Sequence, residues 1–456
     1  MKKYIFPLLA MIVLPLTMTS CFDDEEEVEY SEDCYISAFS LGTLKRSLYK
    51  KSSAGLDSIY TTTFTGTYFP MTINQRNLTI ENLDSLPIRT RLGAVLTTVS
   101  FQGILVWRKA NLTEDADTSW TTYSSSDSID LREPLHFRVV SESGRSSRTY
   151  TVKVNVHQQE ADSTHWDSLG TAAALTSMAE RKALVWKQQI VVVGKMTDGT
   201  LAFVKHPCTT AGEWTSTTTS GAEMAVPTTL QQMGGALFMS TTDGQVVTSN
   251  DGATWAQYDA PAQEGLTLVG ASDEYLYALA DGKLYRTSGS AWEEETLDDE
   301  GSNLPTGHLN GVYYTMKNGA KRLMLIGSRT SDDKEATVWA KAWREGKETT
   351  ETWVYYTPNG ADTHHCPIMK GLSIVPYDDG MQALGGDLSE ILHSYDHGIT
   401  WKTYDNSDMT ADPELQKAAK EAQYLTAAAD EESFLWVLVD DRVWRGRINR
   451  LGFVRK

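Results

Sequence analysis

The sequence predicts an all-β protein with two domains, an N-terminal immunoglobulin-like β-sandwich followed by a six-bladed β-propeller. Two observations lead to this prediction. Residues 150–156 alternate apolar and polar side chains, the period of two that marks a strand with one buried face. From Ala172 onward the chain repeats a unit of roughly 40 residues with four short strand patterns, which is typical of propeller blades. A seventh blade would need strands in Ala172–Glu180, whose Ala, Met and Leu residues favour a helix instead.

Residues 1–20 have the pattern of a secretory signal peptide. Residues 2–3 are lysines, and the apolar run 5–16 is too short to span a membrane. The segment ends in the sequence MTSC, which resembles a bacterial lipobox. We therefore expect lipidation of Cys21 after cleavage of the signal peptide.

An acidic run, Asp23–Glu27, follows the lipobox directly. It is similar to the export signal that follows the lipidated cysteine in surface lipoproteins of the Bacteroidota. A solvated tether is the other interpretation, and both can hold because an anchor needs a tether. Residues 21–33 are predicted to be a lipidated acidic tether on the outer membrane, with the protein facing the cell exterior. The lipid would be the only contact with the membrane.

The charge balance of the chain excludes one class of partner. The chain carries a formal net charge of -19 at pH 7, and its basic residues cluster only in the last dozen positions. Nucleic acid is therefore not an expected partner, since binding it requires neutralising phosphates.

Beyond Cys21 there are three cysteines, Cys34, Cys208 and Cys366, an odd number that implies no complete disulfide framework. A bridge between Cys208 and Cys366 stays open.

Residues 34–157 are predicted to form the β-sandwich. The clearest element is a hairpin whose strands are Leu135–Val140 and Ser147–His157. Earlier candidate strands are Ser58–Phe69, Asn77–Glu81, Thr90–Phe101 and Ile104–Arg108. Several short strands separated by turn residues are typical of an immunoglobulin-like fold, which is most often a spacer. The polar segment 158–171 is predicted to be a linker.

Residues 172–456 are predicted to form the propeller. Five units place a tryptophan at the start of the fourth strand: Trp214, Trp255, Trp292, Trp353 and Trp401. In the sixth unit the last strand is expected at Leu451–Val454, with Phe453 in place of the tryptophan. These aromatic side chains are expected to pack between blades.

The most specific motif has the form S-x-D-x-G-x-T-W, and it comprises Ser394, Asp396, Gly398, Thr400 and Trp401. It resembles the Asp-box of sialidase-type propellers. Physically, Asp396 can accept hydrogen bonds from turn amides, and Gly398 can adopt a positive φ. The motif therefore predicts how a hairpin is built rather than what the protein binds.

A second copy of the motif is expected at Thr248, Asn250, Gly252, Thr254 and Trp255. Asn250 stands where the first copy has an aspartate, and asparagine caps a turn nearly as well. Both boxes are expected on the face opposite the ligand-binding loops.

The whole arrangement resembles uncharacterised Bacteroidota surface lipoproteins with an N-terminal β-sandwich and a C-terminal Asp-box propeller of the BNR or kelch-like type. The lipobox, the two boxes and the ending Val443–Phe453 carry this resemblance. Because no activity is agreed for that group, the resemblance implies architecture and location only.

Catalysis of the sialidase type would need three arginines around a carboxylate, a tyrosine with a glutamate partner, and an acid/base aspartate. The loops between second and third strands carry aspartates instead: Asp198, Asp243, Asp281, Asp332, Asp333, Asp387, Asp440 and Asp441. Turn formation is the favoured interpretation of most of them, and cation binding is the alternative. We predict no catalytic residues, although an inverting hydrolase built on two of these acids stays open.

The candidate ligand face comprises Asp332, Asp333, Trp339, Trp343 and Asp387. The two tryptophans are less fixed by the repeat than the others, so we expect them to be exposed. His364, His365 and Cys366 have ligand-type side chains, but adjacent strand residues point to opposite faces and suit one metal poorly. No metal and no cofactor are predicted.

The sequence therefore predicts a lipid-anchored, non-catalytic cell-surface protein that recognises a glycan or a partner protein through the propeller. The alternatives are an Asp-box glycoside hydrolase and a structural scaffold of a surface complex. Because a row of aspartates would repel an anionic sugar, we predict no sialoside hydrolysis and weak or no affinity for acidic glycans.

Overall fold

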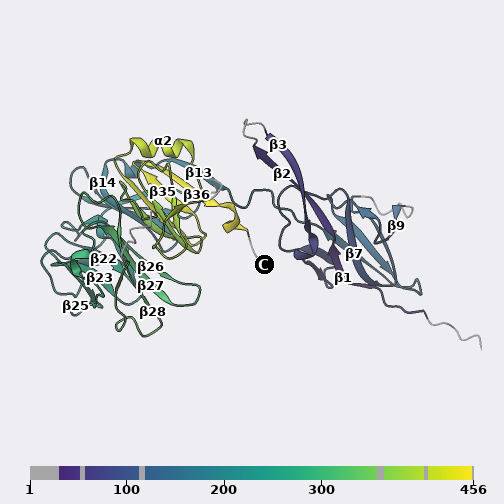
Figure 1. The fold of residues 1–456 in the computed structure, drawn as a ribbon, viewed down its shortest axis with the longest axis horizontal. Coiled ribbons are helices and arrows are strands. Elements are labelled where there is room, and N and C mark those ends of the chain that lie inside the picture. The colour runs from purple at the N-terminus through teal and green to yellow at the C-terminus, as the bar shows by residue number, and fades with distance from the viewer. Residues whose placement is uncertain (1–29, 52–56, 112–118, 357–363, 405–408, 454–456) are drawn as a thin grey trace, which may run out of the picture. The chain divides into compact units, whose positions relative to one another are not determined.

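A computed structural model describes residues 30–51, 57–111, 119–356, 364–404 and 409–453 (Figure 1). The chain divides into two compact units between Glu160 and Ala161. Among the described residues, no helix has the length and apolar character needed to cross a membrane. The signal peptide, Cys21 and the acidic run lie outside the described residues.

The first unit consists of three sheets. One has the order β1 (Tyr35–Leu41), β7 (Val95–Gln102), β10 (Ser128–Ile129). The second has the order β4 (Met71–Asn74), β5 (Thr79–Asn82), β12 (Ser147–Lys153), β11 (Leu135–Val140), β8 (Ile104–Lys109), β9 (Thr121–Thr122). The third joins β3 (Asp57–Thr65), β2 (Thr43–Lys51) and β6 (Thr90–Arg91), and a 3-10 turn, η1, spans Gly66–Tyr68.

The predicted hairpin of the first unit is present as β11 and β12, with Leu135 opposite Val152. Its inward positions are apolar and buried, as the alternation requires. Phe137 on β11 meets Phe39 on β1 edge to face at 5.5 Å, so two of the sheets share one core.

The second unit consists of six four-stranded antiparallel sheets. The first five are β14–β17 (Met178–Trp186, Gln189–Met196, Leu201–Pro207, Thr215–Thr218), β18–β21 (Gln231–Met233, Ala236–Ser240, Val246–Ser249, Ala256–Gln257), β22–β25 (Thr267–Ala271, Leu276–Ala280, Lys283–Thr287, Glu293–Glu294), β26–β29 (Gly307–Thr315, Lys321–Ser328, Thr337–Trp343, Val354–Tyr355) and β30–β33 (Ser373–Tyr377, Gly380–Leu384, Leu392–Ser394, Lys402–Thr403).

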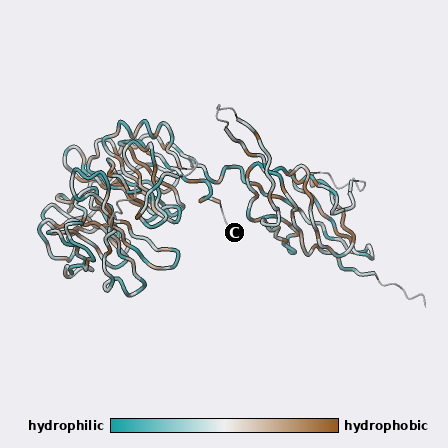
Figure 2. Tube along the Cα trace, in the orientation of Figure 1, coloured by the Kyte–Doolittle hydropathy of each residue, from teal (hydrophilic) through white to brown (hydrophobic). Residues whose placement is uncertain are grey.

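The sixth sheet combines both ends of the unit: β13 (Thr164–Thr171), β36 (Arg442–Ile448), β35 (Leu435–Val439) and β34 (Leu425–Ala429). The short helical elements of this unit are η3 (Ala173–Leu175), η4 (Pro227–Thr229), η5 (Gly301–Asn303), α2 (Pro413–Glu421) and η7 (Asn449–Gly452). Apolar residues follow the strands and polar residues follow the connecting loops (Figure 2).

Two expectations for the sixth sheet are wrong. Residues 451–453 of the expected last strand do not form a strand, since η7 ends at Gly452, and Phe453 does not take the tryptophan position; Val454 lies outside the described residues. The fourth strand is β13, which lies in the segment predicted to be a linker. Trp166 of β13 lies opposite Gly446 on β36, and its ring occupies the space that a Cβ at residue 446 would need. An outer strand with one solvated face has a polar composition, and for this reason the sequence of β13 resembles a linker.

The six sheets of the second unit form a ring with β14, β18, β22, β26, β30 and β34 innermost. Side chains of these innermost strands connect neighbouring sheets. The hydroxyl of Thr426 on β34 accepts from the amide of Ala183 on β14 at 3.1 Å. In the same way, Asn310 of β26 accepts from Ile374 of β30 at 3.1 Å. Since β14 and β34 belong to the first and last sheets, the innermost strands close on one another as well.

Candidate functional site

The box motif at residues 394–401 folds into a turn around Asp396. One carboxylate oxygen of Asp396 accepts from the amide of Thr400 at 2.9 Å and from the hydroxyl of Ser394 at 2.8 Å. These contacts and others in the turn hold the pKa of Asp396 below its ordinary value, against the opposing effect of burial. The indole of Trp401 donates to the carbonyl of Gly398, and its side chain is 2 % exposed.

The second box differs from the prediction by one residue. Asp251, and not Asn250, accepts from the amides of Ala253 at 2.8 Å and Thr254 at 2.7 Å. Its serine is Ser249 rather than the expected Thr248, and the Ser249 hydroxyl donates to Asp251 at 3.0 Å. The motif here is S-x-D-G-x-T-W, one residue shorter than the first copy. When the two copies are aligned on their tryptophans, Asn250 and not Asp251 therefore stands opposite Asp396.

Both boxes fix one sheet to the sheet before it. A Cβ at Gly398 would lie 2.2 Å from the Met324 sulfur on β27, and one at Gly252 would lie 2.4 Å from the Phe203 ring on β16. Both glycines also have positive φ, so each position favours glycine for two reasons, the lack of space for a Cβ and the backbone conformation. These contacts give the boxes a structural role.

Several loop aspartates form turns, as the favoured interpretation held. Asp333 accepts from the amides of Arg329 at 2.8 Å and Thr330 at 3.1 Å, which lowers its pKa. Asp387 accepts from Ser389, and Asp440 accepts from Tyr424. Their oxygens already serve the local backbone.

The expected exposure of Trp339 and Trp343 is wrong. Trp339 is 0 % exposed, and its indole donates to the carbonyl of Asn303 at 2.9 Å. Trp343 is 4 % exposed and stacks on Tyr313 at 6.0 Å. Of the predicted ligand face, Asp332 and Asp387 are exposed and Asp333 is half-buried. The tryptophans therefore offer no stacking surface.

The histidine and cysteine cluster also has a structural explanation. Cys366 is 2 % exposed in an apolar core, and burial raises its pKa to about 12. His365 approaches Glu335 at 4.0 Å. Within the described part of the chain, no group of three or more such side chains could hold a metal. Cys208 and Cys366 are both free thiols, so the bridge left open by the sequence is not formed.

A cavity with a volume of about 950 Å³ is lined by the innermost strands of all six sheets. Its polar lining includes side chains from β14, η4, β26, β30 and β34, among them Thr229, Asn310, Ser373 and Thr426. A cavity of this size suits a small ligand or one or two sugar units. The centre of the ring is therefore the candidate site.

Two cations of β14, Arg181 and Lys182, line this cavity. Burial lowers the pKa of Lys182 to about 8, with no carboxylate acting against that effect. Arg181 is 7 % exposed and donates from Nη2 to the carbonyl of Tyr424 at 3.1 Å. Its Nε and Nη1 are enclosed without a hydrogen-bond partner. Burial lowers the pKa of Arg181 to about 10, although Asp440 and Asp441 oppose this.

The carboxylate that lines the cavity, Asp273, is already engaged. It accepts from the Lys321 ammonium at 2.6 Å and from the Tyr313 hydroxyl at 2.6 Å. These bonds lower the pKa of Asp273 in spite of burial. Sequence reasoning had singled out none of these lining residues.

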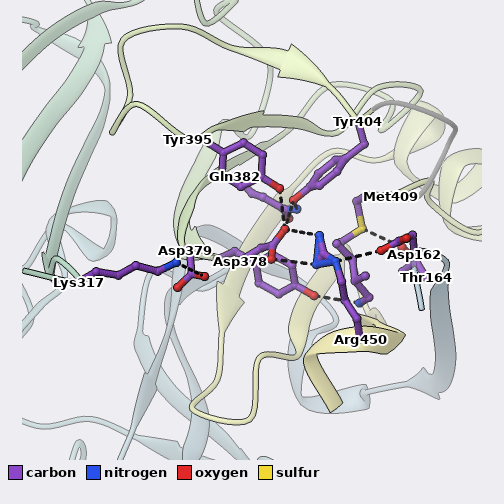
Figure 3. A network of polar contacts seen from close by, with 12 residues as sticks. Asp162, Thr164, Lys317, Asp378, Asp379, Gln382, Tyr395, Tyr404, Met409 and Arg450 are labelled. Atoms are coloured by element: carbon purple, nitrogen blue, oxygen red, sulfur yellow. Dashed lines mark hydrogen bonds and ion pairs between the residues drawn. The ribbon is translucent and has the colours of Figure 1, made fainter. Parts of the chain in front are cut away.

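A different polar network joins the two ends of the second unit (Figure 3). Arg450 of η7 binds Asp378 through two bonds of 2.9 and 2.6 Å, and its Nε donates to Asp162 at 3.1 Å. Asp378 also accepts from the Tyr395 hydroxyl at 2.8 Å. Because Asp162 precedes β13 and Arg450 follows β36, this network fastens the closing pair of strands.

These features define a class: an N-terminal β unit followed by a β-propeller. The family comparison agrees. Residues 160–456 match the model described as the DUF6242 beta propeller domain, and residues 39–154 match the DUF6242 N-terminal domain. The chain belongs to this family, a family of unknown function. No curated protein matches the chain.

Solved structures of several kinds align with the chain. An α-L-arabinofuranosidase, Arb93A from Fusarium graminearum, aligns at TM-score 0.38 and 11% identity over 63% of this chain and 98% of its own. PorZ of Porphyromonas gingivalis, a surface component of the type-IX secretion system, aligns at 0.36 and 9% over 84% and 69%. SapL1 lectin, in complex with a methyl fucoside, aligns at 0.36 and 8% over 59% and 91%. At these scores the likenesses support no functional conclusion.

Proposed function

We propose that this protein is a lipid-anchored, surface-exposed binding protein whose propeller takes a glycan into the cavity at its centre. We infer that the six sheets are six blades and that the first unit is an immunoglobulin-like spacer. The observation that carries the proposal is the cavity of about 950 Å³, which is lined by the innermost strands of all six sheets, five of which contribute hydroxyl or amide side chains. Hydrogen-bonding groups around a concave site are what sugar recognition requires.

Binding is preferred over hydrolysis because of how the carboxylates are used. A glycosidase needs two carboxyl groups on either side of the scissile bond. Asp273, which lines the cavity, is held by Lys321 and Tyr313. Asp333 and Asp387 accept from their own turns, and Asp440 accepts from the amides of Gln423 and Tyr424. The Asp-box hydrolase remains the alternative function, and its test is turnover of aryl glycosides.

A partner protein is the second candidate ligand, favoured by the hairpin of β2 and β3. This hairpin extends from the rest of its unit (Figure 1) and exposes Tyr49, Ile59 and Tyr60 at 54%, 62% and 44%. Exposed aromatic and aliphatic side chains of this kind are enriched at protein interfaces.

The test of the proposed function is a glycan array probed with the purified protein. We expect retention on a defined set of saccharides and no release of sugar from them. A bulky substitution in the lining, Thr229→Trp, should abolish retention, whereas Thr218→Trp, at an exposed strand position outside the lining, should not. Failure of every glycan to bind, or retention unaffected by Thr229→Trp, would contradict the proposal.

The anchor is tested separately through Cys21. Replacing Cys21 with alanine should release the protein into the soluble fraction, because the thiol is the acylation point. Replacing Asp23–Glu27 with alanine should keep the lipid but remove protease accessibility on intact cells. A Cys21→Ala variant that stays detergent-dependent would contradict lipid anchoring.

A further inference from the structure

The centre of the ring differs in charge from the protein as a whole. The chain has a formal net charge of -19, yet the charged side chains that line the cavity are Arg181, Lys182 and Asp273. Asp273 is neutralised by Lys321. The titratable groups that complete the lining are His308 and Tyr313. The cavity therefore carries a positive excess inside an acidic molecule.

Lys182 carries most of this excess. It lies on β14 and lines the cavity, and its side chain is half-buried, so its exposed part faces the cavity. No hydrogen bond or ion pair joins it to another described residue, and burial is the sole cause of its lowered pKa. A buried ammonium without a counter-ion is costly, and proteins usually pair such groups.

Arg181 adds a second positive charge next to Lys182. Its Nη2 is fixed by the carbonyl of Tyr424, while Nε and Nη1 have no partner. Asp440 and Asp441 partly offset its charge from outside the cavity lining. The carboxylate of Asp440 accepts hydrogen bonds from the amides of Gln423 and Tyr424 instead. The two aspartates therefore act on Arg181 only through space, and Nε and Nη1 stay unpaired.

We propose that the cavity is a carboxylate-binding site in which the Lys182 ammonium contacts the carboxylate of the bound ligand and Arg181 supplies a second positive charge. This inference rests on the proposed function, and it names the ligand class as saccharides that carry a carboxylate, such as uronic acids. It reverses the sequence-based expectation of weak affinity for acidic glycans. That expectation considered the loop aspartates and not the residues inside the ring.

The test is calorimetric titration of the purified full-length protein with D-glucuronate, D-glucose and acetate. Glucuronate and glucose differ only in the carboxylate, and acetate is that carboxylate without a sugar. We expect glucuronate to bind at least about tenfold more tightly than glucose, a difference of about 1.4 kcal/mol. Acetate should compete with glucuronate.

Two variants locate the effect. Lys182→Met should remove the preference for glucuronate, and Lys182→Arg should retain most of it. Lys417→Met removes the same charge from the exposed face of α2 and should leave the preference unchanged. If Lys182→Met does not fold, acetate competition in the unmodified protein still decides the question.

The outcomes separate this inference from the proposed function. Equal affinity for glucuronate and glucose, or a preference that survives Lys182→Met, would overturn the carboxylate site and leave glycan binding intact. Acetate binding that depends on Lys182, with neither sugar bound, would support the anion site and overturn the choice of a saccharide. No binding of glucuronate or acetate would overturn the inference outright.

Discussion

Lys341 and Lys182 are both withdrawn from water, but their surroundings differ. Lys341 on β28 is 1% exposed, and its ammonium donates to Glu295 at 2.5 Å, where Trp353 also donates at 2.7 Å. Arg286 pairs with the other oxygen of Glu295. Lys182 has no such partner and faces a cavity. A buried cation with a complete set of partners stabilises the fold, whereas a cation without partners beside a cavity indicates a ligand site.

The largest expected effect comes from breaking the satisfied network. Glu295→Gln keeps the shape but leaves Lys341 without its carboxylate partner and Arg286 with only the exposed Glu293, so we expect a loss of about 3–5 kcal/mol in unfolding free energy. Chemical denaturation measures it. The control is Glu294→Gln at the neighbouring residue, because Glu294 pairs with Lys283 in an exposed position and the change should cost under about 0.5 kcal/mol. Equal effects would contradict the distinction.

The closing network should show a smaller effect. Arg450→Ala removes two charge-assisted bonds to Asp378 and one to Asp162, and we expect a loss of about 2 kcal/mol. Lys317→Ala is the matched control, since Lys317 forms an exposed pair with Asp379 in the same turn. A thermal shift for the control as large as that for Arg450→Ala would show that the network does not fasten the ring.

The two box assignments can be separated by a pair of neighbouring variants. Asp251→Ala leaves the amides of Ala253 and Thr254 without acceptors and should cost about 1–3 kcal/mol. Asn250→Ala should cost less than about 0.5 kcal/mol, because the side chain of Asn250 has no described role in the turn. The reverse order would restore the alignment first expected from the sequence.

The smallest effect is a pH dependence from Lys182. Its folded pKa of about 8 lies below the ordinary value of 10.5, so between these values the unfolded state binds more protons. Stability should therefore gain on the order of 1 kcal/mol as the pH rises from 8 to 10. Arg181, Asp273, His308 and Tyr313 also line the cavity, so the gain is read as the difference between the wild type and Lys182→Met. An identical pH profile in both proteins would contradict the unpaired state of Lys182.

Much of the fold was predictable because its signals are local. The hairpin of β11 and β12 alternates with period two, and the tryptophans repeat at fixed points, so the sheets followed from patterns along the chain. The strand β13 was missed because its partner, β36, lies at the other end of the propeller. Its pairing depends on closure of the ring, which no local pattern records.

The candidate site was less predictable than the fold. The loop aspartates are numerous, yet Asp333 and Asp387 bond to their own turns, and Asp440 bonds to the amides of Gln423 and Tyr424. Arg181 and Lys182 are ordinary charged residues in the middle of a strand. The closed ring of sheets places both residues around a cavity, where no described carboxylate pairs with Lys182. A useful sequence signal would be a basic pair in the middle of an innermost strand in an otherwise acidic propeller.

The most direct test of the central claim is the pKa of the Lys182 ammonium, measured by NMR of ¹³C-labelled lysine with and without D-glucuronate, with Lys182→Arg to assign the resonance. In the free protein we expect a value near 8. A carboxylate in contact with the ammonium favours its charged form, so bound glucuronate should raise the pKa toward 10, and D-glucose should leave it unchanged. A pKa that does not move at saturating glucuronate would contradict the claim that this unpaired cation marks the ligand site.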